Sequence, residues 1–232
     1  MRVLVVQNFE KTALGQVGRA LAEAEAEIEM IMAHEGEPLP PVHGRHDAII
    51  VLGGAQNALA DEAHPYLPQL ANLMADFAIA GKAVLGICLG SQILARGLGA
   101  ENLIGAAPEF GWQEVTATEA GRIDPVLRAA PAQFPIFQWH DDTFTLPEGA
   151  VRLASNAAVE NQAFRFGRAA YGMQFHFEAD RRLVEGWNAD FAGHLAEFQP
   201  DWANRHPKEA ARHGPEADAA GLAIARAWVA LI

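Results

Sequence analysis

The most informative stretch of this sequence is Lys82-Ala83-Val84-Leu85-Gly86-Ile87-Cys88-Leu89-Gly90-Ser91-Gln92. Residues 83–87 are apolar and predict a buried strand, and the residues after Cys88 predict a helix. Gly86 and Gly90 lie two residues before and after the cysteine, as expected where a strand turns so sharply into a helix that the backbones nearly touch. This spacing predicts a nucleophile elbow, in which Cys88 occupies a strained corner with its sulfur above the sheet.

The predicted helix begins directly after Cys88, so its backbone N–H groups and positive dipole end face the sulfur. Such surroundings favour the thiolate, which is the nucleophilic form of cysteine. Cys88 is the only cysteine of the chain, and a lone cysteine is usually a small buried hydrophobe. The flanking glycines favour the interpretation as a nucleophile.

Strand-like and helix-like segments alternate through the first hundred residues. Strands are expected at 3–6, 28–32, 47–52 and 83–87, with a loop at 34–46. Helices are expected from Thr12, as a cap, to about Glu25, and at 66–80. Continuous apolar strands that alternate with helices predict the α/β class, with an open, mostly parallel sheet flanked by helices on both faces.

The second half of the chain has shorter strands and then helices. Strands are expected at 112–118, 136–140, 151–154, 162–166 and 170–175, and helices at about 180–198 and 216–231. Residues 199–215 are polar, contain two prolines and predict a surface loop. With no obvious linker, we expect a single domain over 1–232, with a core at about 1–198 and a C-terminal helical extension at 199–232.

Composition limits the possible partners and location. The 232 residues are 50% hydrophobic and 20% charged, which is ordinary for a soluble globular protein, and carry a formal net charge of −12. This charge argues against nucleic acid, whose phosphates it would repel. No apolar run has the roughly 20 residues of a membrane span. A single cysteine forms no internal disulfide, so we expect a cytoplasmic protein.

A second informative segment is Tyr171-Gly172-Met173-Gln174-Phe175-His176-Phe177-Glu178. Residues two apart on a strand face the same side, so Glu178 is positioned to orient the His176 imidazole. A parallel sheet brings its strand ends to one edge, which would place His176 near Cys88. The alternative is a hydrogen-bonded structural histidine beside a solvated glutamate.

Gly53-Gly54 follows the expected strand at 47–52. Glycines at a strand end let peptide N–H groups turn toward the same edge of the sheet. Together with the N–H of Leu89, one of them would form an oxyanion hole, whose donors each stabilise a tetrahedral intermediate by roughly 3–4 kcal/mol. The alternative is that the pair forms only a tight turn.

These motifs, in this order, resemble the class I (triad-type) glutamine amidotransferases, especially the amidotransferase part of GMP synthase and its free-standing relatives. The resemblance covers about residues 45–180 and implies a flavodoxin-like fold. It also implies hydrolysis of the γ-amide of glutamine through a cysteinyl thioester, without metal or organic cofactor. Cys88 would be the nucleophile, His176 the general base and acid, and Glu178 its orienting partner. Gly54 and Leu89 would supply the oxyanion-hole N–H groups.

The resemblance also implies contacts with the substrate. Gln92 would contact the bound glutamine. Trp139-His140-Asp141-Asp142 aligns with a family stretch that usually reads Ser-His-Gly-Asp, so His140 and Asp142 match it while Asp141 replaces the glycine. Phe177 replaces the more usual proline or valine between the histidine and the glutamate, a change expected to leave the triad intact.

Several functions remain open at this point. Family members without a synthase domain hand ammonia to a separate synthase subunit or hydrolyse other γ-glutamyl compounds, so a γ-glutamyl amide or peptide hydrolase is the main alternative to a glutaminase. Less favoured alternatives are a non-enzymatic relative and a redox-sensing thiol protein. In either enzymatic interpretation the substrate is a small molecule.

Overall fold

The strand that leads to Cys88, β4 (Ala83–Ile87), lies inside a nine-stranded sheet in the computed structural model, which describes residues 1–232. The parallel part contains, in spatial order, β2 (Glu27–Met32), β1 (Arg2–Gln7), β3 (Ala48–Val51), β4 and β11 (Ala170–Met173). Antiparallel pairing continues through β10 (Ala163–Phe166), β9 (Val151–Ser155), β6 (Glu109–Ala117) and β7 (Gln133–His140). β5 (Asn102–Leu103) and β8 (Thr143–Phe144) form a separate pair.

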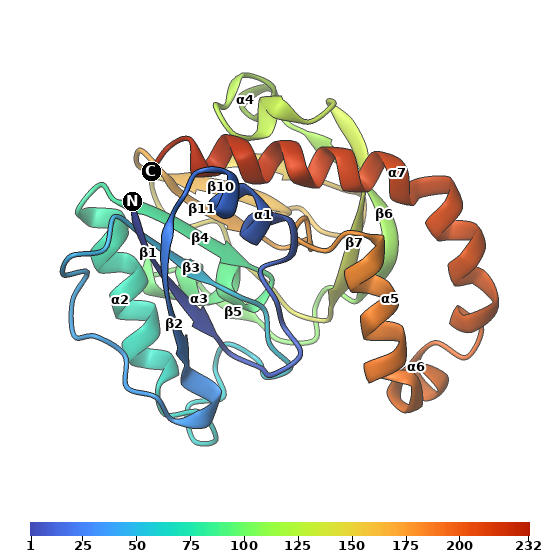
Figure 1. Ribbon diagram of the computed structural model, residues 1–232, viewed down its shortest axis with the longest axis horizontal. Helices are drawn as coiled ribbons and strands as arrows, with labels where there is room; N and C mark the ends of the chain where they lie inside the picture. The colour runs from blue at the N-terminus through green and yellow to red at the C-terminus, as the bar shows by residue number, and fades with distance from the viewer.

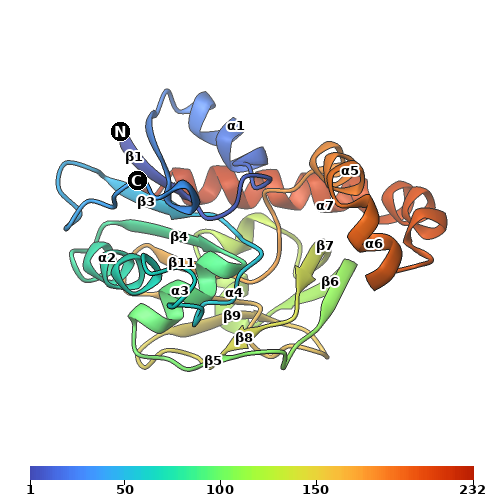
Figure 2. The same ribbon diagram turned by 90° about the horizontal axis from the view of Figure 1, so that it is seen from below.

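Helices cover both faces of this sheet. They are α1 (Gly15–Glu23), α2 (Leu67–Ile79), α3 (Leu89–Gly97), α4 (Glu119–Ile123), α5 (Arg181–Asp190), α6 (Ala192–Phe198) and α7 (Trp202–Val229), with short 3₁₀ turns at η1 (Ala33–Glu35) and η2 (Leu127–Ala129). Figures 1 and 2 show α1 and α7 on one face and α2 and α3 on the other. The predicted α/β architecture, an open and mostly parallel sheet flanked by helices, is confirmed.

The apolar strands divide their side chains between two cores. Val3 and Val5 of β1 pack in the core beneath α1 and α7, whereas Leu4 and Val6 pack in the core beneath α2 and α3. All four are fully buried. Continuous apolar strands therefore follow from helical cover on both faces.

The C-terminal region departs from the prediction. The expected loop at 199–215 is wrong, because α7 runs from Trp202 to Val229 and contains Pro207 and Pro215. Each proline removes one helical hydrogen bond, but the residues four positions earlier, Ala203 and Ala211, are exposed and can turn their carbonyls to water. Buried residues then recur along α7 at helical spacing, so packing outweighs the local cost of the prolines.

Two helix boundaries also differ from the prediction. Thr12 does not cap α1, because the helix begins at Gly15 and Leu14 occupies the N-cap position. The Thr12 hydroxyl donates to the Phe9 carbonyl instead (2.7 Å). The single helix expected at 180–198 is divided into α5 and α6 at Phe191, whose φ of −113° is not helical. None of the helices combines the length and apolar character needed to cross a membrane.

Candidate active site

Cys88 forms a strained corner between β4 and α3. Its φ of 50° and ψ of −111° make it one of two non-glycine residues with positive φ, a conformation that surrounding structure must hold in place. The Cys88 N–H donates to the Met173 carbonyl (2.8 Å), and the Ser91 hydroxyl donates to the Cys88 carbonyl (2.7 Å). The corner is therefore fixed from β11 on one side and from α3 on the other.

The glycines around this corner allow close backbone contact. A Cβ atom on Gly86 would lie 2.3 Å from the Gly90 carbonyl oxygen, and one on Gly90 would lie 2.0 Å from the Val51 carbonyl oxygen. Real Cβ atoms do not approach other atoms so closely. The tight strand-to-helix contact predicted from the Gly-x-Cys-x-Gly spacing is thus present.

His176 and Glu178 form a buried pair beside the corner. His176 Nδ1 lies 2.7 Å from Glu178 Oε1, and the two side chains are only 8% and 4% exposed. The His176 N–H donates to the Phe137 carbonyl of β7 (2.8 Å). On the other side, the Gln16 N–H donates to the Glu178 carbonyl (2.9 Å) and its side chain to the Phe177 carbonyl (3.0 Å). The pair is therefore held between β7 and α1.

The charge state of His176 depends on its two neighbours. Burial alone would lower its pKa, but the Glu178 carboxylate and the Cys88 sulfur outweigh burial and hold the pKa of His176 well above the usual 6.5. Trp187 of α5 lies edge-to-face with the imidazole, with ring centroids 5.2 Å apart. The site thus favours an imidazolium close to the sulfur.

Gly53, Gly54 and Leu89 lie around the same corner, as the sequence predicts. A Cβ on Gly53 would lie 3.3 Å from His176 Cε1 and 3.6 Å from Cys88 Cβ, and one on Gly54 would lie 2.7 Å from Leu89 Cδ2. No hydrogen bond within the protein uses the N–H of Gly53 or Gly54. These donors remain available to a ligand at the Cys88 corner.

The structure also brings Gln92, His140 and Asp142 into one cluster. The Asp142 carbonyl accepts from Gln92 Nε2 (3.3 Å) and lies 3.1 Å from His140 Nδ1, and the Asp142 carboxylate accepts from the Gly105 N–H (2.7 Å). Just before this cluster, the Trp139 carbonyl oxygen lies 3.7 Å from Cys88 Sγ. The three residues therefore support one another beside Cys88.

Two buried residues of this region are not indicated as site residues by the sequence. Trp187 has only the features of a helix-packing residue, because nothing in the sequence places α5 over His176. Glu109 lies directly across from His140 in the β6–β7 pair and approaches its Nε2 at 3.2 Å. The sequence predicts a strand that starts at 112, whereas β6 begins at Glu109, so the pairing with His140 is not apparent from the pattern.

An open pocket of about 510 Å³ lies near the same edge of the sheet. It is lined by residues that follow β1, β2 and β3, among them Asn8, His34, Ala55 and Gln56. Ala55 directly follows Gly54, so the pocket adjoins the proposed oxyanion donors. No group of three or more His, Cys, Asp or Glu side chains in the structure is arranged to hold a metal ion.

The parallel sheet and the elbow at its carboxyl edge define an α/β protein of the nucleophile-elbow class. Residues 5–185 match the family described as glutamine amidotransferase class-I, so the chain belongs to the class I glutamine amidotransferases. The family resemblance inferred from the motifs is confirmed.

Individual relatives agree with this assignment. The chain is 32% identical over 169 residues to the glutamine amidotransferase-like protein YfeJ of Salmonella typhimurium, covering 72% of this chain and 71% of YfeJ. It is 29% identical to a glutamine-hydrolyzing GMP synthase subunit of Methanoregula boonei, covering 81% of this chain and 96% of that relative. A solved glutamine amidotransferase of Thermotoga maritima superposes with a TM-score of 0.85 at 28% identity, over 98% of both chains.

Proposed function

We propose that this protein hydrolyses the γ-amide of glutamine through a thioester on Cys88. The observation that carries the proposal is the position of Cys88, on a strained elbow beside the buried His176–Glu178 pair. A nucleophile, a base and an orienting carboxylate in this order are the arrangement needed for covalent catalysis. Membership of the class I amidotransferases supports amide chemistry at this site.

In the first half-reaction, the Cys88 thiolate attacks the γ-carbonyl carbon and forms a C–S bond. The N–H groups of Gly54 and Leu89, next to Gly53, stabilise the oxyanion. The tetrahedral intermediate then collapses, the C–N bond breaks, and His176 gives its proton to the departing nitrogen, which leaves as ammonia. Because its pKa is raised, His176 carries that proton at neutral pH.

In the second half-reaction, neutral His176 accepts a proton from water. The resulting hydroxide attacks the thioester, the C–S bond breaks, and glutamate leaves. The proton taken from water stays on His176, which restores the imidazolium–thiolate pair. Glu178 holds the imidazole in the required tautomer through Nδ1 in both halves (2.7 Å). The cluster of Gln92, His140 and Asp142 lies where it can line the glutamine site.

We also propose that the ammonia passes to a synthase partner. The support is the match to the Methanoregula boonei GMP synthase subunit over 96% of its length. A cytoplasmic location stays a prediction based on the single cysteine, as does the exclusion of nucleic acid based on the net charge of −12.

The second candidate is a γ-glutamyl amide hydrolase that uses the same three residues. The pocket of about 510 Å³ beside Gly54 favours it, because a group attached to the amide nitrogen would find space there. Glutamine, whose amide carries no such group, does not require this pocket. Turnover of bulky γ-glutamyl amides in preference to glutamine would identify this second activity.

The first experiment is affinity labelling with a chloroketone or diazoketone analogue of glutamine, with the adduct located by mass spectrometry. We expect labelling at Cys88, protection by excess glutamine, and neither labelling nor turnover in Cys88→Ala. Protection by γ-glutamyl amides but not by glutamine would favour the second candidate. Retained turnover in Cys88→Ala would refute both.

A further inference from the structure

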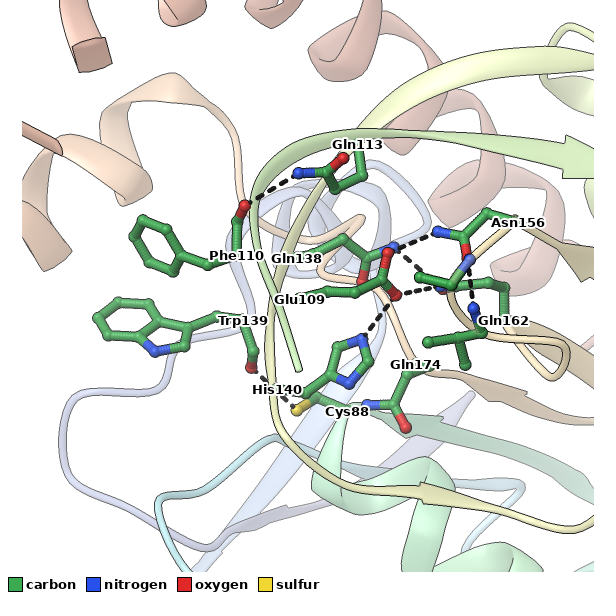
Figure 3. A network of polar contacts seen from close by, with 12 residues as sticks. Cys88, Glu109, Phe110, Gln113, Gln138, Trp139, His140, Asn156, Gln162 and Gln174 are labelled. Atoms are coloured by element: carbon green, nitrogen blue, oxygen red, sulfur yellow. Dashed lines mark hydrogen bonds and ion pairs between the residues drawn. The ribbon is translucent and has the colours of Figure 1, made fainter. Parts of the chain in front are cut away.

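A layer of buried polar side chains lies beside Cys88, where an apolar core would be expected (Figure 3). This polar layer consists of the buried Glu109, Gln138, His140, Gln162 and Gln174, together with the half-buried Asn156. Three of its members, the glutamines, have no exposed surface, and Glu109 is only 8% exposed. Burying so many polar groups is costly unless each is hydrogen-bonded, so the layer requires a reason.

Glu109 is the centre of the polar layer. Its Oε2 lies 3.2 Å from His140 Nε2 and accepts from Gln162 Nε2, while its Oε1 accepts from Asn156 Nδ2 (2.6 Å). A carboxylate offers only acceptors, which suits the two amide N–H donors and an N–H at His140 Nε2. A carboxamide at the same place would turn its own NH₂ group toward at least one of them.

Two routes connect the polar layer with the residues around the nucleophile. His140 links Glu109 with the Asp142 carbonyl, because its Nε2 lies 3.2 Å from Glu109 Oε2 and its Nδ1 lies 3.1 Å from that carbonyl, which also accepts from Gln92. Gln92 donates as well to Gln174 Oε1 (3.2 Å). His140 directly follows Trp139, whose carbonyl contacts Cys88 Sγ, so the end of β7 lies between the polar layer and the sulfur (Figure 3).

We propose that Glu109 is a positioning residue of the active site. Its carboxylate fixes His140 and, through His140, the segment from Trp139 to Asp142 that borders Cys88 and holds Gln92. This inference rests on the proposed function, since it assigns that segment to the wall of the glutamyl site. Glu109 does not contact the Cys88–His176–Glu178 group, so its loss should weaken substrate binding more than chemistry.

The test compares Glu109→Gln with wild type by the protection of Cys88 from iodoacetamide. L-Glutamine is the protecting ligand, and a γ-glutamyl amide is used in parallel. We expect the half-protecting concentration to rise at least tenfold in Glu109→Gln, while the alkylation rate without ligand stays within threefold. Steady-state turnover should show the same pattern, with KM raised and kcat nearly unchanged.

Asp124→Asn is the matched control. Asp124 is also a buried carboxylate, bonded to Arg165 Nε (2.8 Å) and to the Tyr171 hydroxyl (3.1 Å), but it has no hydrogen bond to the polar layer. The Asp124→Asn substitution should lower the melting temperature of the protein without changing the concentration of glutamine that half-protects Cys88. Glu109→Asp keeps the charge on a shorter side chain and should give an intermediate midpoint, which is decisive if Glu109→Gln does not fold.

The outcomes separate the two proposals. If glutamine protects the wild type and the half-protecting concentration is unchanged in the folded Glu109 variants, the positioning role is overturned and the proposed function still stands. Wild type protected by neither glutamine nor a γ-glutamyl amide would overturn the proposed function, and the positioning role with it. If the half-protecting concentration rises equally in Asp124→Asn, Glu109 contributes only to general stability and the positioning role is overturned.

Discussion

His176 Nδ1 lies 2.7 Å from Glu178 Oε1, in a pair that is almost completely buried. Removing the charge of Glu178 while keeping its shape tests what this contact does. In Glu178→Gln we expect kcat/KM to fall between about 10²- and 10⁴-fold, because the imidazole loses its preferred tautomer and the stabilisation of its positive charge. The assay is glutamine hydrolysis, with circular dichroism to show that the variant is folded. Activity within threefold of wild type would contradict this role.

The raised pKa of His176 predicts a particular pH dependence of stability. The native state holds its proton more tightly than the unfolded state, whose pKa is near 6.5, so this interaction stabilises the fold fully below about pH 6.5. The stabilisation is lost as pH rises through the higher native pKa. The free energy of unfolding of wild type relative to His176→Gln should therefore decrease with pH above 6.5. If the difference in the free energy of unfolding between wild type and His176→Gln increased with pH instead, the explanation from the raised pKa would be wrong.

The elbow should not tolerate a side chain at Gly90. Since a Cβ there would lie 2.0 Å from the Val51 carbonyl oxygen, Gly90→Ala must displace backbone. We expect a loss of about 3 kcal/mol in the free energy of unfolding, at the upper end of ordinary overpacking. Gly186→Ala is the control, because nothing lies within 4 Å of a Cβ on that glycine of α5. It should be stabilising by up to about 1 kcal/mol. Equal effects in urea denaturation would refute the packing explanation.

Trp187 should affect catalysis through its contact with His176. Trp187→Phe removes part of the ring that lies against the imidazole and the N–H that donates to the Lys11 carbonyl (3.2 Å). We expect kcat/KM to fall about 3- to 10-fold, or roughly 1 kcal/mol in transition-state stabilisation. Trp228→Phe is a close match, since its indole also donates to a carbonyl at 3.2 Å, that of Val84. Trp228→Phe should lower the stability of the protein and leave kcat/KM unchanged. An equal loss of kcat/KM in both variants would contradict a specific role of Trp187 beside His176.

The parallel architecture could be predicted from the sequence because its signals are local. Apolar runs such as 3–6 and 47–52 require cover on both faces, and the glycines beside Cys88 permit one sharp turn. The sequence also predicts the His176–Glu178 pair, but the structure forms it differently: β11 ends at Met173 instead of continuing to 175, and Phe177 and Glu178 lie in a turn in which the Ala179 N–H donates to the His176 carbonyl (3.3 Å). The catalytic roles of these residues remain predictions for the experiments above.

Local signals failed where distant parts of the chain decide the outcome. The prolines at 207 and 215 indicate a loop, but the buried side of α7 packs along the sheet and keeps the helix intact. Trp202, near its start, lies edge-to-face with Phe110 of β6 at 4.8 Å. No local pattern contains that contact.

The sequence by itself therefore determined the fold class, the family and the position of the elbow, since these depend on periodicity and on residues a few positions apart. Only the tertiary structure decided which side chains support the histidines beside Cys88. Trp187 reaches His176 from α5, and Glu109 reaches His140 across the β6–β7 pair, over separations of 11 and 31 residues. Such contacts arise from packing between elements, and a linear pattern does not record which elements will meet.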